Sequence, residues 1–156
     1  MGCTESREYS DDKAKASKIM SKNYQFQVYA ALKKDSLNEV TEIIPKKFDV
    51  RFKMPAFMGR TALHIAAEYA SKSIIAYLIS LDADTNALDN SGCPPIFLAL
   101  ASGNLMGANA IYNLGTKVNL NIVTQHNMSF HDFICVSKKK ESLELLKRLN
   151  YSKIKL

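Results

Sequence analysis

Histidine and cysteine are the side chains of this 156-residue chain best suited to catalysis or metal binding, and each type occurs three times. His126, His131 and Cys135 are the most closely spaced group. A zinc site built on them lacks a fourth ligand, for which Cys93 is the only spare thiol, and the spacing matches no common zinc module. We therefore expect no metal site.

Other catalytic patterns are missing from the sequence. It has no glycine-rich phosphate loop, no Gly-x-Ser-x-Gly elbow and no His-Glu-x-x-His motif. Asp82 and Asp84 are a pair of carboxylates in a turn, where acidic residues are common. The sequence predicts a protein that is not an enzyme and uses no cofactor and no small-molecule substrate. The run 138–140 is too short, and too poor in neighbouring aromatics, to indicate nucleic-acid binding.

The amino terminus carries a modification pattern instead. Met1 is followed by Gly2, Cys3 and, four residues after the glycine, Ser6, which fits the pattern for N-myristoylation of Gly2. One myristoyl chain binds membranes only marginally, so a second signal is needed. Cys3 is a candidate for palmitoylation. The polar stretch 1–22 is predicted to be an arm outside the folded domain.

Charge and composition fit a soluble chain with a basic end. The net charge of +6 is concentrated in residues 138–156, where seven basic and two acidic side chains give +5, whereas residues 54–137 carry three and five, giving −2. The basic end favours an acidic partner such as anionic lipid. No apolar run approaches the length of a membrane span, and no secretory signal is expected. An odd number of distant cysteines suggests a reducing compartment.

These candidate groups must be positioned by helices that repeat every 33 residues. Residues at the same place in two consecutive units are Gly59 and Gly92, Ala66 and Ala99, Leu78 and Ile111, and Asn86 and Asn119. A fixed step of this length is typical of a solenoid of helix pairs. Before the repeat, apolar stripes within 26–32 and 37–44, broken at 34–36 and closed by Pro45, predict a divergent first pair. Residues 45–58 are predicted to be an extended loop, a finger, rather than a helix.

The best-formed unit resembles the ankyrin repeat. It reads Thr61-Ala62-Leu63-His64-x-Ala66-Ala67. The resemblance implies that Thr61 caps an inner helix and that His64 hydrogen-bonds the helix start and the next finger. Ala70 stands where the family has a left-handed glycine, which predicts a cost of about 1 kcal/mol. The third copy is read at 128–131, with His131 in the place of His64.

The predicted fold is all-α: an ankyrin solenoid of about four helix-turn-helix repeats joined by fingers, occupying residues 23–156, after the arm 1–22. The repeats are placed at about 23–50, 56–88, 89–121 and 122–152. The resemblance implies protein binding through the finger tips and the concave inner-helix face, with Tyr69 as an anchor. The finger candidates are Met58, Arg60, Asp89, Asn90, Ser91 and Cys93. The inner-helix candidates are Ile65, Glu68, Tyr69, Leu98, Ala101 and Ser102.

The first 23 residues also resemble the acylated amino terminus of heterotrimeric G-protein alpha subunits, through Met-Gly-Cys-Thr-x-Ser and the later stretch 17–23. This likeness implies dual acylation and does not extend to a nucleotide-binding domain. The predicted function is a non-enzymatic adaptor in the cytoplasm that binds a protein and is held at a membrane by Gly2 and Cys3. The alternative is a structural subunit embedded in a large cytoskeletal or ciliary assembly, with the arm threading along its neighbours.

Overall fold

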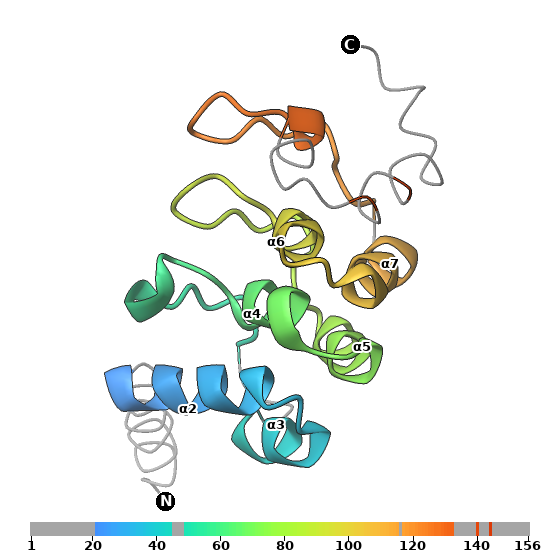
Figure 1. The fold of residues 1–156 in the computed structure, drawn as a ribbon. Helices are drawn as coiled ribbons and strands as arrows, with labels where there is room; N and C mark the ends of the chain where they lie inside the picture. The colour runs from blue at the N-terminus through green and yellow to red at the C-terminus, as the bar shows by residue number, and fades with distance from the viewer. Residues whose placement is uncertain (1–20, 45–48, 116, 133–139, 141–143, 145–156) are drawn as a thin grey trace, which may run out of the picture.

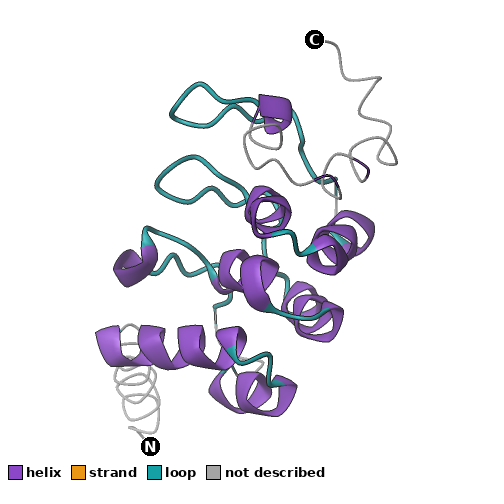
Figure 2. Ribbon diagram, viewed as in Figure 1, coloured by secondary structure: helices purple, strands orange, loops and turns teal. Residues whose placement is uncertain are grey.

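The computed structural model describes residues 21–44, 49–115, 117–132, 140 and 144, and within them the chain is helical. Figure 1 shows helix pairs stacked one above another, with loops projecting from the same edge of the stack. In Figure 2 these loops connect the helices, and the described part contains no strand, only two isolated antiparallel bridges. The all-α prediction is therefore confirmed.

The first pair consists of α2 (Lys22–Lys33) and α3 (Leu37–Ile43). Each helix begins after a serine that caps it, because Ser21 Oγ accepts from the Tyr24 N–H and Ser36 Oγ from the Glu39 N–H. The two helices are separated at the predicted break, where Asp35 adopts a left-handed backbone conformation (φ 57°). The sequence thus places both helices and the turn between them.

The next two pairs repeat with the predicted step. The second consists of α4 (Ala62–Tyr69) and α5 (Lys72–Ser80), and the third of α6 (Pro95–Ser102) and α7 (Leu105–Leu114). Both α4 and α6 are eight residues long and begin 33 residues apart. The small side chains Ala66, Ala67 and Ala99 are fully buried, since the inner helix α4 packs closely against both α2 and α6.

The turn at Ala70 corrects a prediction. Ala70 has φ −95° and ψ 160°, an extended conformation, whereas its counterpart Gly103 is left-handed with φ 82°. The chain leaves α4 through this extended residue and enters α5 at the N-cap Ser71. The predicted strain at Ala70 is therefore wrong, because no left-handed residue is needed there.

The first finger also differs from the prediction. It is closed by a hydrogen bond of 2.9 Å from the Met54 N–H to the Arg60 carbonyl, and its tip contains a short 3₁₀ helix, η1 (Pro55–Phe57). Before η1, Val50 lies in a turn and Met54 has an extended backbone, and both side chains are buried. The finger itself is confirmed, but its tip is helical because Pro55 favours the first position of a helical turn.

The last described unit is out of register with the predicted signature. Ser129 and Asp132 cap the helical turn at 130–132 reciprocally, so Ser129 is the equivalent of Thr61 and Pro94. The predicted alignment of His131 with His64 is wrong by one residue, and the His131 side chain is exposed. Two residues are added between Asn119 and Thr124, relative to Asn86 and Asp89.

Three predicted parts lie largely outside the described residues. They are the arm 1–22, of which only residues 21 and 22 are described, the basic segment 138–156, and the outer helix of the fourth repeat, placed at about 122–152. The division into an arm and a repeat domain stays a prediction.

Candidate protein-binding surface

The finger tips are joined to each other through backbone hydrogen bonds. The Asn90 N–H donates to the Met58 carbonyl at 2.9 Å, and the Gln125 N–H donates to the Ser91 carbonyl at 3.0 Å. Met58 is left-handed and 54% exposed. The tips therefore form one continuous edge, in which Met58 and Asn90 present exposed side chains and Ser91 is half-buried.

Two predicted finger residues are buried instead of exposed. Asp89 Oδ1 accepts hydrogen bonds from the Ser91 and Cys93 N–H groups at 2.8 and 3.0 Å, so this carboxylate shapes the finger from inside. Burial raises the pKa of the Cys93 thiol to about 11, and the thiol stays protonated and unreactive at neutral pH. The expectation that Asp89 and Cys93 are exposed is wrong, because the turn folds both inward.

Arg60 and Glu68 are half-buried and pair with each other. Arg60 Nη1 lies 3.1 Å from Glu68 Oε2, and Arg60 Nε lies 3.6 Å from Asp89 Oδ2. Arg60 thus joins the inner helix α4 to two successive fingers. Both side chains lie where the sequence placed them, but their charges are largely satisfied within the chain.

The inner-helix candidates also differ from one another in how far they are buried. Ile65 and Leu98 are buried, so their predicted exposure is wrong. The reason is that each inner helix has neighbours on more than one side, which leaves only a narrow stripe in contact with solvent. Ala101 and Ser102 are half-buried, and the Ser102 hydroxyl donates to the Ala99 carbonyl at 3.0 Å. Tyr69, at the end of α4, is 39% exposed.

His64 connects its own helix start to the next finger. Its Nε2 lies 3.0 Å from the Cys93 carbonyl, which can only accept, so Nε2 carries the hydrogen. Nδ1 then accepts from the Thr61 N–H at 3.1 Å and lies 2.9 Å from the Thr61 hydroxyl. Burial lowers the pKa of His64 to about 4. In the neutral ring both nitrogens have a hydrogen-bond partner. The predicted structural role of His64, and Thr61 as the N-cap of α4, are confirmed.

Four aromatic rings, two of them exposed and two half-buried, form a cluster that we name the aromatic surface. The rings come from α2, η1 and α4. Tyr29 stacks on Phe57 with centroids 4.7 Å apart, Phe26 meets Phe57 edge-on at 5.0 Å, and Tyr69 meets Tyr29 edge-on at 6.1 Å. The Lys33 ammonium lies 5.8 and 5.7 Å from the Tyr29 and Tyr69 ring centroids.

Three of these rings were not among the predicted binding residues, because Phe26 and Tyr29 belong to the apolar stripe predicted for the first helix and Phe57 to the predicted extended finger. The signal was their spacing. Phe26 and Tyr29 are three residues apart and share one face of α2, whereas the buried Val28 and Leu32 share another. Only Tyr69 was predicted. A hydrogen bond with Tyr29, and then one with Glu68, raise the pKa of Tyr69, so its hydroxyl remains a donor at neutral pH.

Comparison with known proteins identifies the architecture. A sequence profile described as "Ankyrin repeats (3 copies)" matches residues 28–122, which is more than half of the chain. The chain belongs to the ankyrin-repeat family. An ankyrin domain is a protein–protein interaction module, and the family is not an enzymatic one.

Individual relatives share parts of this ankyrin stack. An ankyrin repeat protein of Acanthamoeba polyphaga mimivirus is 37% identical over 71 residues, 46% of this chain and 10% of the relative. The NF-kappa-B inhibitor cactus of Drosophila melanogaster is 30% identical over 91 residues, 58% of this chain and 18% of the relative. An ankyrin repeat protein of fowlpox virus is 32% identical over 76 residues, which are 47% of this chain and 40% of the relative. The chain thus spans less than half the length of these relatives.

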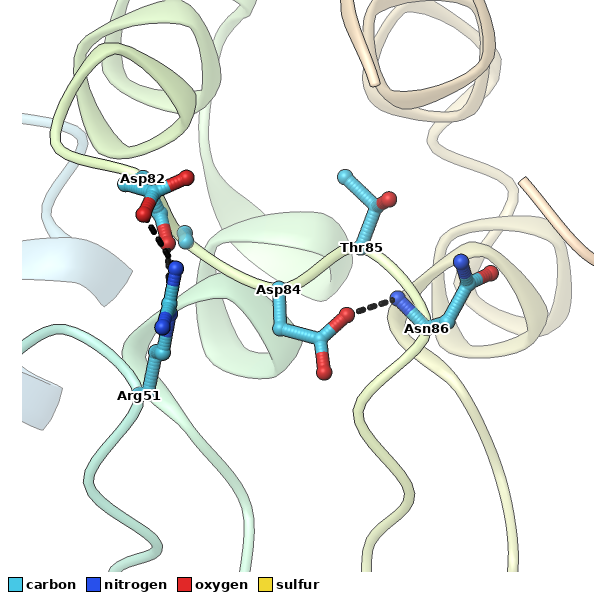
Figure 3. A pocket seen from close by; sticks show the side chains of 6 residues that line it. Arg51, Asp82, Asp84, Thr85 and Asn86 are labelled. Atoms are coloured by element: carbon cyan, nitrogen blue, oxygen red, sulfur yellow. Dashed lines mark hydrogen bonds and ion pairs between the residues drawn. The ribbon is translucent and has the colours of Figure 1, made fainter. Parts of the chain in front are cut away.

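A polar hollow lies between the turns that join successive ankyrin repeats (Figure 3), on segments other than the aromatic surface. In the figure Arg51 and Asp82 point toward one another; they form an ion pair, and Arg51 Nε also donates a 3.0 Å hydrogen bond to the Asp82 carbonyl. The Asn86 amide donates to the Lys117 carbonyl at 3.1 Å and accepts from the Asn119 N–H at 2.7 Å. These groups are already paired between repeats, which indicates a structural role.

The described residues contain neither a candidate metal-binding group nor a candidate membrane-spanning helix. Within the described residues, no group of three or more His, Cys, Asp and Glu side chains is placed to hold a metal ion. None of the helices in that part of the chain has both the length and the apolar character needed to cross a membrane.

Proposed function

We propose that this ankyrin domain is a non-enzymatic adaptor that captures a protein partner on the aromatic surface. The observation that supports the proposal is the position of Phe26 and Tyr69, which remain 48% and 39% exposed although they pack against Tyr29 and Phe57. Large exposed rings held by their neighbours lose little side-chain entropy on binding, and tyrosine is enriched among the residues that dominate binding energy.

The setting of the surface supports the same role. It is built by two inner helices and a finger, and α4 is fixed to the next finger by His64 and Arg60. The rings are therefore carried on a rigid support, as an effective binding site requires. One relative, cactus, is named as an inhibitor of another protein, NF-kappa-B, which fits a partner-binding role.

The adaptor is proposed to be held at a membrane from the cytoplasmic side. The pattern Gly2, Cys3 and Ser6 supports acylation, with one chain on Gly2 and a second on Cys3. The basic residues of 138–156 would add attraction to anionic lipid of roughly 1 kcal/mol per suitably placed Lys or Arg.

The binding role is tested by proximity labelling in cells. The chain is fused to a promiscuous biotin ligase, and its labelled proteins are compared with those of the double variant Phe57→Ala, Tyr69→Ala. We expect the double variant to lose a defined set of proteins. Met106→Ala is the control, because Met106 is an exposed apolar residue on the outer helix α7. Identical protein sets from the wild type and the folded double variant would disprove the proposal.

The tether is tested separately with an alkyne analogue of myristate. Wild-type protein should be labelled and Gly2→Ala should not. Cys3→Ser should keep the myristate label and lose labelling by an alkyne palmitate. A wild-type protein that takes up neither label, with an amino-terminal peptide confirmed by mass spectrometry, would rule out the tether and leave the binding role unaffected.

A further inference from the structure

The face of α2 that carries Phe26 and Tyr29 also carries a lysine at each end. Lys22, Phe26, Tyr29 and Lys33 are separated by four, three and four residues, a spacing that places them along one side of a helix. All except Tyr29, which is half-buried, are exposed. The aromatic surface is therefore continued on α2 as a stripe with a cation, two rings and a second cation, which we call the α2 stripe.

The elements that carry the four rings of the aromatic surface have almost no negative charge. Neither α2 nor the finger segment 50–60 contains an aspartate or a glutamate. In α4 the only carboxylate is Glu68, and it is paired with Arg60. Asp35, just beyond α2, accepts a 2.7 Å hydrogen bond from the Ser71 N–H. Among the described residues, Lys22 and Lys33 have no carboxylate partner of their own.

We infer that the α2 stripe recognises a short acidic peptide segment of the partner, with apolar side chains in its centre and a carboxylate toward each end. This inference rests on the proposed function and specifies the chemistry of its partner. Apolar side chains would lie against Phe26, Tyr29 and Phe57. The carboxylates would pair with the ammonium groups of Lys22 and Lys33, neither of which forms an ion pair with a carboxylate in the described part of the chain.

The dimensions of the stripe set the length of the segment. Lys22 and Lys33 are eleven residues apart, which corresponds to about 16 Å along a helix at roughly 1.5 Å per residue. An extended chain covers that distance in about five residues at roughly 3.3 Å each. The two carboxylates should therefore be four to six positions apart, with one or two aromatic or aliphatic residues between them.

A peptide fits this surface better than an anionic membrane. The two lysines are separated by Phe26 and Tyr29, which both pack against the Phe57 ring. Membrane attraction by basic residues depends on clusters of several charges. Two charges at fixed spacing around an apolar centre are instead suited to a defined sequence.

The test is a selection of phage-displayed random dodecapeptides on the full-length wild-type chain. We expect the enriched peptides to share an apolar centre with carboxylates four to six positions apart. Lys22→Glu, Lys33→Glu should bind a synthetic consensus peptide about tenfold more weakly, and should select peptides with basic residues at those two positions. Lys22→Gln, Lys33→Gln removes charge without reversing it and should show a smaller loss. Lys72→Glu, an exposed lysine at the start of α5, is the control and should bind as wild type.

Other outcomes separate this inference from the proposed function. Enriched peptides that are uncharged or basic, yet lose binding to Phe57→Ala, Tyr69→Ala, would overturn the acidic chemistry and keep the binding surface. Peptides that bind all variants equally would overturn both. Binding of phosphatidylserine vesicles that is abolished by Lys22→Glu, Lys33→Glu, without acidic peptides being enriched, would assign the stripe to a membrane. No enrichment on a chain with native circular dichroism would overturn the inference alone, because folded partners are tested by proximity labelling.

Discussion

Helices α4 and α6 hold equivalent positions in successive repeats, and the third residue of each, fully buried, contacts the next unit by a different interaction. In α4 this residue is His64, which hydrogen-bonds the Cys93 carbonyl at 3.0 Å. In α6 it is Phe97, whose ring centroid lies 4.8 Å from that of Phe130. The same position in the stack is stabilised once by a directional polar contact and once by an aromatic contact.

The two solutions differ in what they tolerate. A hydrogen bond to one carbonyl fixes the register of the next finger, whereas ring packing depends on shape and can accept small displacements. The unit that follows α6 is the one with two added residues between Asn119 and Thr124. The apolar contact therefore occurs where the spacing departs from 33 residues, and the polar contact where it is regular.

Of the variants that test these two contacts, Phe97→Ala is expected to lose the most stability. Phe97→Ala removes a fully buried ring and its contact with Phe130, and should lower the free energy of unfolding by about 3–5 kcal/mol. Urea denaturation followed by circular dichroism measures the loss. Phe26→Ala is the matched control, and its half-exposed ring should cost less than about 1.5 kcal/mol. Equal losses for the two variants would mean that Phe97 is not part of the repeat contact described here.

The second expected effect is a pH dependence that only the α4 contact can produce. Burial lowers the pKa of His64 to about 4 in the folded chain, against about 6.5 when unfolded. Above pH 6.5 both states are neutral and His64 gives no dependence. Between pH 6.5 and 4 only the unfolded state takes up the proton, so stability falls with decreasing pH, by about 3 kcal/mol in total. Below pH 4 this contribution stops changing.

Urea denaturation between pH 7.5 and 4 measures this slope, and His64→Phe provides the comparison because it copies the residue found at 97. The difference between wild type and His64→Phe isolates the histidine from carboxylates that also titrate in acid. His126→Ala, which removes an exposed histidine, should retain the wild-type slope. A His64→Phe variant with the same slope as wild type would show that His64 takes up a proton equally readily in the folded and the unfolded state.

The sequence predicts the fold through its repetition. The step between Ala66 and Ala99 recurs because close helix packing requires small residues there, and this requirement is visible without a structure. The role of His64 could be expected for the same reason, since the residues on either side of it recur in the family. The shift of register after Asn119 could not be predicted, because both Thr124 and Ser129 form local hydrogen bonds that any short insertion would permit.

The candidate site was predicted less well than the fold. Ile65 and Leu98 were placed on the exposed face, but helix periodicity does not reveal how many neighbours an inner helix has. Phe26 and Phe57 were not predicted to bind a partner, because aromatic residues are usually buried. Their place in one cluster depends on contacts between α2 and a finger 31 residues later, from Phe26 to Phe57, which no local pattern encodes.

A smaller effect is expected where the two inner helices end. Gly103 follows α6 with φ 82°, a conformation that costs about 1–2 kcal/mol for a residue with a Cβ atom. Gly103→Ala should therefore lower stability by that amount, measured as a lower urea midpoint with an unchanged m-value. A midpoint equal to that of the wild type would show that the turn after α6 can adopt the extended form seen after α4.

The smallest expected effect is that of Ala70→Gly, and the sign of its change in stability decides between a left-handed and an extended turn after α4. The family pattern predicts that Ala70→Gly relieves strain and raises stability by about 1 kcal/mol. The observed φ of −95° predicts the opposite, a loss of about 0.5–1 kcal/mol, because glycine would only increase the entropy of the unfolded chain. The Ala70 carbonyl also accepts a 2.9 Å hydrogen bond from Asn104 Nδ2 of the next repeat, which holds this extended geometry in place. Urea midpoints of Ala70→Gly and Gly103→Ala that both fall would establish that equivalent turns in this stack have different backbone conformations, whereas a rise for Ala70→Gly would restore the family's left-handed turn after α4.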